Sequence, residues 1–252
     1  IYYDWTRCLP CNNPKHSPRL HLATDEVIDL LAWTRRLIAP KGILILHMPG
    51  NTAGISFENF ADLVVNMEEI SNMEEMLTLD RIPVFTILGE SIPRSPCPSY
   101  RRDRGLERNR NYIAHLVVLG MFPWGHAPQD SAYEETLKLF GAFRPFALES
   151  YRLHSILARA VQTGWEGVYG AVYASPERAL VVLSNTNPDK RKNVVWRVRP
   201  EVLALARDNG FRLRDVTSGG VRRITSADLT DGSLTVDLDG YEYRLFEVLA
   251  TK

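Results

Sequence analysis

The run Ile43-Leu44-Ile45-Leu46-His47-Met48 decides the fold class of this 252-residue chain. It is apolar with scarcely a break over the length of one strand, and Pro49, Gly50 and Asn51 end it. A strand that is apolar on both faces is typical of a parallel sheet that helices cover on each side. The run therefore predicts an α/β region in which strands alternate with helices.

A strand and a helix precede this run. Ile1–Trp5 is a short, β-favouring series of aromatic and apolar residues. From Thr24 to Ile38 apolar residues recur three or four apart, and two acids open the segment, where a helix dipole favours negative charge. Pro40-Lys41-Gly42 ends this predicted helix. Within it we expect Trp33 to lie in the core.

Further strands and helices are expected downstream of the run. The predicted strands are Ala61–Met67, Pro83–Leu88 and, as a shorter one, Met121–Gly125. A long loop rich in Pro and Arg runs from about Pro93 to Arg102. Glu107–Gly120 reads as a helix, and Ser131–Leu157 as mostly helix with a bend or break at Pro145.

The pattern changes near Val161, because strand-like runs then follow one another. They are Gly167–Tyr173, Ala179–Ser184, Val194–Val198, Phe211–Val216, Leu234–Leu238 and Tyr241–Leu249. Alternating apolar and polar residues in the last two predict half-buried antiparallel strands. Strand–helix alternation followed by strands alone predicts two domains. We expect a domain of parallel strands with covering helices in residues 1–158 and an antiparallel β-sandwich in residues 162–252.

Charge and hydropathy exclude some partners. The chain has 30 basic and 30 acidic residues, so its formal net charge is zero. That balance gives no general attraction to nucleic acid or to an anionic membrane. No apolar run reaches the roughly 18 residues that a membrane-spanning helix needs. We therefore expect neither a nucleic acid nor a membrane as partner.

The motif Cys8-Leu9-Pro10-Cys11, with His16 and His21 downstream, is a potential zinc or dithiol site. A zinc ribbon needs a second well-spaced pair, and a thioredoxin-type site needs a helix that opens at the motif. The Asn, Pro and Ser residues that follow predict an irregular loop instead. We expect plain loop cysteines and no metal, with a local disulfide as the alternative.

A strand ending in Asp4-Trp5, further βα units and a terminal all-β domain resemble the retaining α-galactosidases and related barrel glycosidases. In that family the nucleophile is an Asp at the end of the fourth barrel strand, and the acid/base lies at the end of the sixth. The resemblance implies that residues 1–158 are the C-terminal part of a (β/α)8 barrel, about strands four to eight. If Met121–Gly125 is strand eight, counting back makes Ile1–Trp5 strand four and Ala61–Met67 strand six.

The resemblance then implies catalytic roles for three acids. Asp4 matches the nucleophile position, and Glu68 or Glu69 matches the acid/base position, where the family usually has Asp. Because strand residues alternate, Asn66 and Glu68 share one face, and we favour Glu68. Retaining hydrolysis places the two carboxyl groups about 5–5.5 Å apart and needs no cofactor. Barrel enzymes place such sites at the carboxyl ends of their strands.

Six more residues are candidates for binding a carbohydrate substrate. They are Trp5, His47, Glu90, Tyr100, Arg101 and Trp124. The three aromatic candidates can stack on a sugar, because the apolar face of a pyranose fits an aromatic plane. His47 either bonds a sugar hydroxyl or is a satisfied core histidine. Glu90 is a reserve acid.

Three classes of function remain open. The first is a glycoside hydrolase, retaining and α-galactosidase-like, or the C-terminal fragment of one. The second is a non-catalytic carbohydrate-binding relative. The third is a structural fragment whose barrel half completes another chain. On the strand count three barrel strands are lacking, so the open edge needs an N-terminal segment or a second chain.

Overall fold

The structure is a computed structural model that describes residues 1–3, 10–11, 13–15, 21–22, 24–38, 40–47, 60–66, 94–96, 105–123, 133–203 and 210–250. These residues form two compact units. The first contains the described residues up to 66 together with 94–96, and the second contains those from 105 onward. The chain is sheet-rich, with few helices among the described residues.

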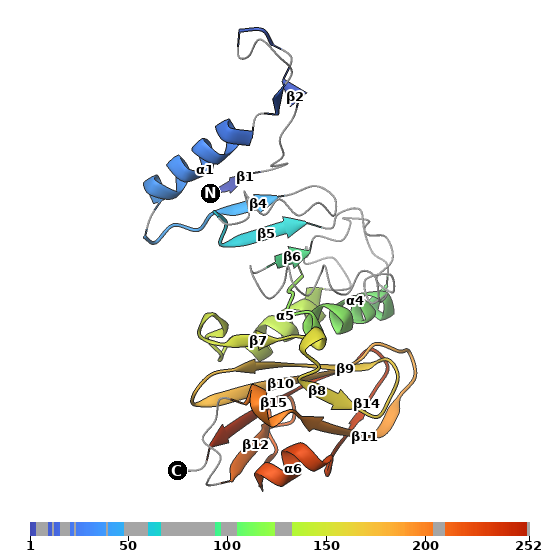
Figure 1. Cartoon of the computed structure of the whole chain (residues 1–252). Helices are drawn as coiled ribbons and strands as arrows, with labels where there is room; N and C mark the ends of the chain where they lie inside the picture. Colours follow the sequence, from blue (N-terminus) through green and yellow to red (C-terminus); the bar gives the residue numbers. More distant parts are fainter. Residues whose placement is uncertain are drawn as a thin grey trace. The chain divides into compact units, whose positions relative to one another are not determined.

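The first unit is built on a parallel sheet with the strand order β1–β4–β5–β6 (Figure 1). The strands are β1 (Tyr2–Tyr3), β4 (Ile45–His47), β5 (Leu63–Asn66) and β6 (Arg94–Pro96). Leu46 pairs with Tyr3 on one side and with Val64 on the other. The apolar run that begins at Ile43 is thus confirmed as an inner strand of a parallel sheet.

Helix α1 (Thr24–Ile38) has the predicted bounds and covers one face of this sheet. Its buried Leu31 packs with Leu44, Leu46 and Val64 in one cluster. Since successive side chains in a strand point to opposite faces, Leu46 and Val64 face α1, whereas His47 and Val65 face away. In a closed barrel, this second face would line the interior.

The amino ends of the strands are held by Asp62. Its Oδ2 atom accepts hydrogen bonds of 2.8 Å from Nη1 of Arg35 and from the backbone amide of Leu44. Burial alone would raise the pKa of this carboxyl, but the bonds from Arg35 and Leu44 outweigh it and lower the pKa. This contact ties the end of α1 to the start of β4 and β5.

Trp33 was expected in the core, but its side chain is 53% exposed. Together with Leu30 and Leu37 it forms an exposed apolar row, which we name the α1 stripe. The helix carries apolar residues on two faces, and Leu31 lies on the face that meets the sheet. Helical spacing predicted both rows but could not tell which one the sheet would bury.

Two segments expected to be loops contain short strands. Arg94–Pro96, placed in the Pro- and Arg-rich loop, pairs as β6 with β5. Proline is tolerated there because β6 is an edge strand of the described sheet. Cys11 and His21 pair through β2 (Pro10–Cys11) and β3 (His21–Leu22). Cys8, His16 and the predicted strand Pro83–Leu88 lie outside the described residues.

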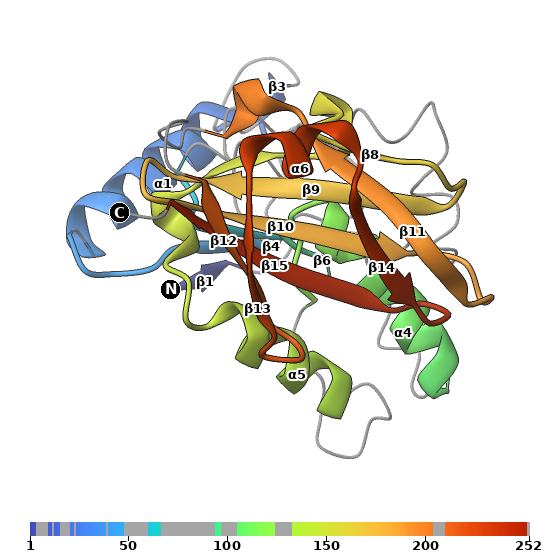
Figure 2. The same cartoon turned by 90° about the horizontal axis from the view of Figure 1, so that it is seen from below.

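The second unit contains two antiparallel sheets, with strand orders β13–β12–β15–β10–β9–β7 and β14–β11–β8. In Figure 2 β9, β10 and β15 run side by side. The strands are β7 (Arg152–His154), β8 (Val161–Thr163), β9 (Val168–Ala174), β10 (Arg178–Asn185), β11 (Arg191–Val198), β12 (Phe211–Asp215), β13 (Val221–Ile224), β14 (Leu234–Leu238) and β15 (Tyr243–Ala250). All six strands predicted in this region are confirmed.

The two sheets share one hydrophobic core. Trp196 of the smaller sheet is fully buried, and its ring stacks on that of Phe246 of the larger sheet, with centroids 5.2 Å apart. Val194 and Val198 lie on the same face of β11 and join the cluster. Buried and exposed residues alternate along β11 and β14, as expected for strands that have one face in the core and the other in solvent.

Helices α4 (Leu106–Val118) and α5 (Tyr133–Phe143) also belong to the second unit. The hydroxyl of Ser184 in β10 donates a buried hydrogen bond of 2.8 Å to the carbonyl of Ala114 in α4. The sequence analysis had grouped these two helices with the parallel strands. The boundary that it predicted between the two domains, at residues 158–162, stays a prediction. Strand β10 is buried on both faces because α4 lies on one face and the core on the other.

The predicted break at Pro145 is confirmed, because α5 ends at Phe143. The helix expected to continue to Leu157 is wrong, since the chain instead forms η2 (Leu148–Ser150), β7 and η3 (Ile156–Ala158). The short strand predicted at Met121–Gly125 is not found in its described part, because residues 121–123 lie in no strand. None of the described helices is long and apolar enough to cross a bilayer.

Two short helical segments complete the second unit. They are helix α6 (Ser226–Asp231), which was not predicted, and η4 (Pro200–Val202). At the start of α6 the side chains of Thr225 and Asp228 each accept a hydrogen bond from the other's backbone amide. Such a capping box fixes a helix end.

Candidate functional site

The carboxyl ends of the parallel strands form the first candidate site. Tyr3, His47 and Asn66 end β1, β4 and β5, and the carboxyl ends of parallel strands meet at one edge of a sheet. His47 is only 4% exposed, and its ring lies 6.2 Å from the ring of Tyr2 in a stacked arrangement. Both rings lie on the face away from α1.

The other predicted site residues lie outside the described part of the chain. These are the acids Asp4, Glu68 and Glu69 and the binding candidates Trp5, Glu90, Tyr100, Arg101 and Trp124. Asp4 follows Tyr3 directly in the sequence, and Glu68 follows the last residue of β5 by two positions. Their roles stay predictions, and His47 is the one predicted site residue that the structure describes.

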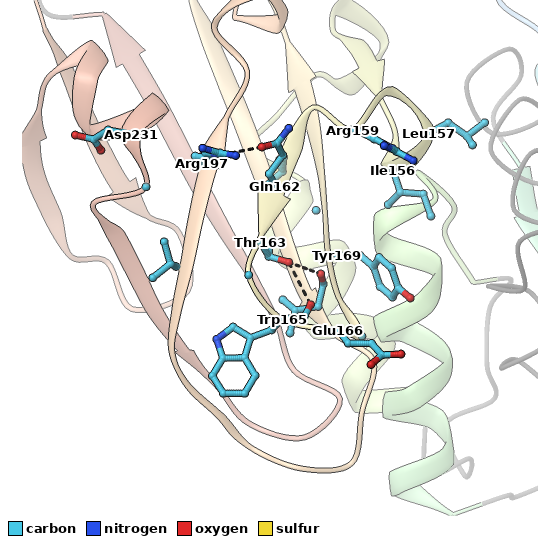
Figure 3. Close-up of a pocket in the computed structure, with 17 residues that line it drawn as sticks. Ile156, Leu157, Arg159, Gln162, Thr163, Trp165, Glu166, Tyr169, Arg197 and Asp231 are labelled. Atoms are coloured by element: carbon cyan, nitrogen blue, oxygen red, sulfur yellow. Dashed lines mark hydrogen bonds between the residues drawn. The ribbon is translucent and has the colours of Figure 1, made fainter.

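A second candidate site lies in the second unit, where the sequence had indicated none. It is a groove of about 820 Å³ beside β8, and we name it the β8 groove (Figure 3). The groove is lined by η3, β8, the turn at residues 164–167, the start of β9 and part of β11. Pockets of about 300–1,000 Å³ are typical of small-ligand sites.

Trp165 stands on the turn between β8 and β9, and its side chain is 44% exposed. Hydrogen bonds from Thr186 and Asn187, which follow β10, fix the backbone of this turn. Thr186 donates from its amide and its hydroxyl to the carbonyl of Gly167, at 2.8 and 2.9 Å. The amide of the Asn187 side chain donates to the carbonyl of Glu166 at 3.1 Å. An exposed indole is therefore presented on a fixed backbone.

The backbone at Gly167 has a φ of 73°, a conformation that favours glycine. A Cβ atom there would also collide with the side chain of Asn187. The turn thus needs glycine for two independent reasons. A Gly-Trp-Glu-Gly segment between two strand-like runs was the signal in the sequence that could have indicated this site.

Polar groups also line the β8 groove. Nε of Arg197 donates to Oε1 of Gln162 at 2.7 Å (Figure 3). Outside the lining, the guanidinium of Arg191 lies over one face of the Trp165 ring, 5.6 Å from its centroid. Burial, followed by the negative charge of Glu166, raises the pKa of Tyr169. The lining therefore offers an aromatic surface together with several hydrogen-bonding groups.

Comparison with known proteins gives a likeness in structure only. No protein-family model and no curated protein matches the sequence. Solved structures do match. A noncanonic maltogenic α-amylase from Thermotoga neapolitana is 12% identical, with a TM-score of 0.54 over 89% of this chain. An Anoxybacillus α-amylase is 11% identical, with a TM-score of 0.53 over 91%.

A glycoside hydrolase family 30 subfamily 8 xylanase from Clostridium acetobutylicum is 10% identical, with a TM-score of 0.50 over 90% of this chain. The chain therefore shares its fold with parts of these three glycoside hydrolases. It spans 59%, 56% and 61% of the length of these three solved chains. At such identities the likeness concerns the fold, and it assigns no residue of this chain to a reaction.

The two sites differ in the groups that they offer. At the strand-end edge the structure describes His47, whereas the predicted acids Asp4, Glu68 and Glu69 lie outside the described residues. The β8 groove holds no comparable set among its lining residues, because its acids Glu166 and Asp231 are both exposed. It offers an aromatic surface and hydrogen-bonding groups, which suit binding.

Proposed function

We propose that the chain is part of a glycoside hydrolase that acts with retention, as the α-galactosidase-like enzymes do. The observation that carries the proposal is the strand order β1–β4–β5, which brings the ends of β1 and β5 to one edge with a single strand between them. The glycoside hydrolase fold supports it. The antiparallel sheets would be the C-terminal sandwich domain of such an enzyme.

The spacing of the strands suits a pair of catalytic carboxyl groups. Neighbouring strands lie about 4.8 Å apart, so the backbones of β1 and β5 are separated by about 10 Å. Side chains that lean toward each other across β4 can close this gap to the roughly 5–5.5 Å of a retaining pair.

Asp4 is proposed as the nucleophile. It follows Tyr3, whose register partner Leu46 is followed by His47. If this register continued by one residue, Asp4 would lie beside the histidine at the strand ends. The Asp4 carboxylate attacks the anomeric carbon while the second carboxyl group protonates the departing oxygen. Water then hydrolyses the glycosyl-enzyme ester, and the second carboxylate takes up the proton of that water.

Glu68 and Glu69 are the two candidates for the acid. Val64 faces α1, whereas Val65 pairs with His47 on the opposite face. If this alternation continued past Asn66, Glu69 would share the face of His47 and Glu68 would face α1. The structure therefore shifts our preference to Glu69, whereas the sequence alone favoured Glu68.

The remaining predicted residues are proposed as substrate contacts. Trp5, Tyr100 and Trp124 would stack on sugar rings, and Arg101 and Glu90 would bind hydroxyl groups. His47, buried at the end of β4, would form part of the wall beside the nucleophile. An N-terminal segment or a second chain would supply the missing barrel strands.

The experiment compares Asp4→Asn, Glu68→Ala and Glu69→Ala in the longest chain that the gene encodes, with a panel of aryl glycosides. Asp4→Asn should lower kcat by several orders of magnitude. The true acid variant should keep most activity on aryl glycosides with good leaving groups and lose it on poor ones, because a good leaving group needs little protonation. Wild-type activity in Asp4→Asn would contradict the assignment.

A further inference from the structure

We propose that the β8 groove binds an uncharged glycan chain, with the indole of Trp165 as the stacking surface. The inference goes beyond hydrolysis, because the groove lies in the second unit and contains none of the proposed catalytic residues. It concerns binding alone and does not require the chain to be an enzyme.

The first argument is the state of the indole. A tryptophan that is 44% exposed costs free energy by ordering water around apolar surface. Here the ring also stands on a turn that Thr186 and Asn187 hold in place, and Arg191 stacks over it. A large, rigid and exposed aromatic side chain is what a ligand with an apolar face requires, because little entropy is lost when it binds.

The second argument is the set of hydrogen-bonding groups that line the groove. Arg197 uses Nε to bind Gln162, and within the described part of the chain its two Nη atoms make no hydrogen bond. The same holds for the amide nitrogen of Gln162 and for the carboxylate of Glu166. Sugar hydroxyls both donate and accept, so this mixture of donors and acceptors matches them.

The third argument is charge. The groove is lined by two arginines, Arg159 and Arg197, and by two acids, Glu166 and Asp231. Their formal charges cancel, so the groove attracts neither a polyanion nor a polycation. A nucleic acid would require a cationic surface, which this lining does not provide. An uncharged, hydroxyl-rich chain is the ligand class that remains.

The test is native electrophoresis of the full chain through gels that contain soluble starch, xylan, mannan or mixed-linkage β-glucan. The protein carries Asp4→Asn, so that hydrolysis cannot alter the polymer. At least one of these neutral glycans should retard migration, and Trp165→Ala should weaken the apparent affinity at least about tenfold. Trp165→Phe should weaken it much less, because a flat ring is kept.

Trp33→Ala provides the matched control, because Trp33 is a similarly exposed tryptophan outside the groove. It should bind like the parent, and thermal melting should show that both alanine variants remain folded. The proposal is overturned if no neutral glycan retards the parent, if Trp165→Ala and Trp33→Ala bind alike, or if only charged polymers such as polygalacturonate retard it. Binding by a chain that hydrolyses nothing would count against the proposed function alone.

Discussion

Glu247 is a buried carboxylate in β15, held between two arginines. Its Oε2 atom lies 2.8 Å from Nη2 of Arg214, and its Oε1 atom lies 3.5 Å from Nη1 of Arg178. The glutamate is 3% exposed, whereas both arginines reach solvent. A buried charge that loses its partner costs far more free energy than the pair itself contributes.

Arg214→Ala should therefore lower the free energy of unfolding by about 2 kcal/mol, because Glu247 keeps only the longer contact with Arg178. Urea unfolding followed by circular dichroism measures this change. Arg212→Ala is the control, since Arg212 lies on the same strand but is exposed. It should alter stability by less than about 0.5 kcal/mol. Equal effects of the two variants would show that Arg214 does not stabilise Glu247.

Asp215 makes stability depend on pH. Burial would raise the pKa of its carboxyl, but bonds from Ser218 and Arg244 outweigh burial and lower the pKa. Since the folded pKa lies below the unfolded one, this stabilisation is present above the unfolded value and is lost as pH falls through the folded value. Asp215→Asn should cost about 1–2 kcal/mol at pH 7. Chemical unfolding should show the difference shrinking below about pH 4; a pH-independent difference would contradict this account.

At the scale of elements, the sequence predicted what depends on local pattern. Helix α1 and strands β9 to β12, β14 and β15 were found because apolar period and turn residues define them. The pattern missed β6 and β7, which exist through pairing with a distant strand. It also missed that α4 and α5 join the antiparallel sheets, because that depends on tertiary contacts such as the one from Ser184 to α4.

The candidate sites divide in the same way. The acids at the strand ends were predicted because an acid that closes an apolar strand can be recognised in the sequence. The β8 groove was not predicted, because Arg197 reaches Gln162 only through the pairing of β8 with β11. The Gly-Trp-Glu-Gly segment was the local signal, but it does not show which distant residues complete the groove.

Two glycines in different elements should respond to alanine in opposite ways. A Cβ atom at Gly170 in β9 would lie 2.6 Å from Cβ of Val161 in β8, so Gly170→Ala should destabilise the fold by about 1–3 kcal/mol. At Gly141 in α5 nothing lies within 4 Å. Gly141→Ala should stabilise by about 0.5–1 kcal/mol, because alanine is the better helix former. Thermal unfolding compares the two, and destabilisation by both would contradict the reading of α5.

At the scale of the whole molecule, the α1 stripe leaves apolar surface exposed. Leu30, Trp33 and Leu37 are 43%, 53% and 62% exposed. Exposed apolar rows promote association. We expect the 252-residue chain to self-associate in sedimentation velocity experiments. Replacing the three stripe residues with Ser should shift it toward monomer, whereas Leu137→Ser, on α5, should not.

The place of β15 has a consequence for how the chain is made. This strand lies in the interior of the six-stranded sheet, between β10 and β12. Both neighbours come well before it in the sequence. During translation β10 and β12 each emerge from the ribosome before β15, so each has one edge that stays unpaired until Tyr243–Ala250 has been made. The second unit therefore cannot complete its six-stranded sheet before this segment is synthesised. A ribosome that stalls shortly before Tyr243 releases a nascent chain that is a substrate for chaperones and proteases, although it already contains every residue of the β8 groove.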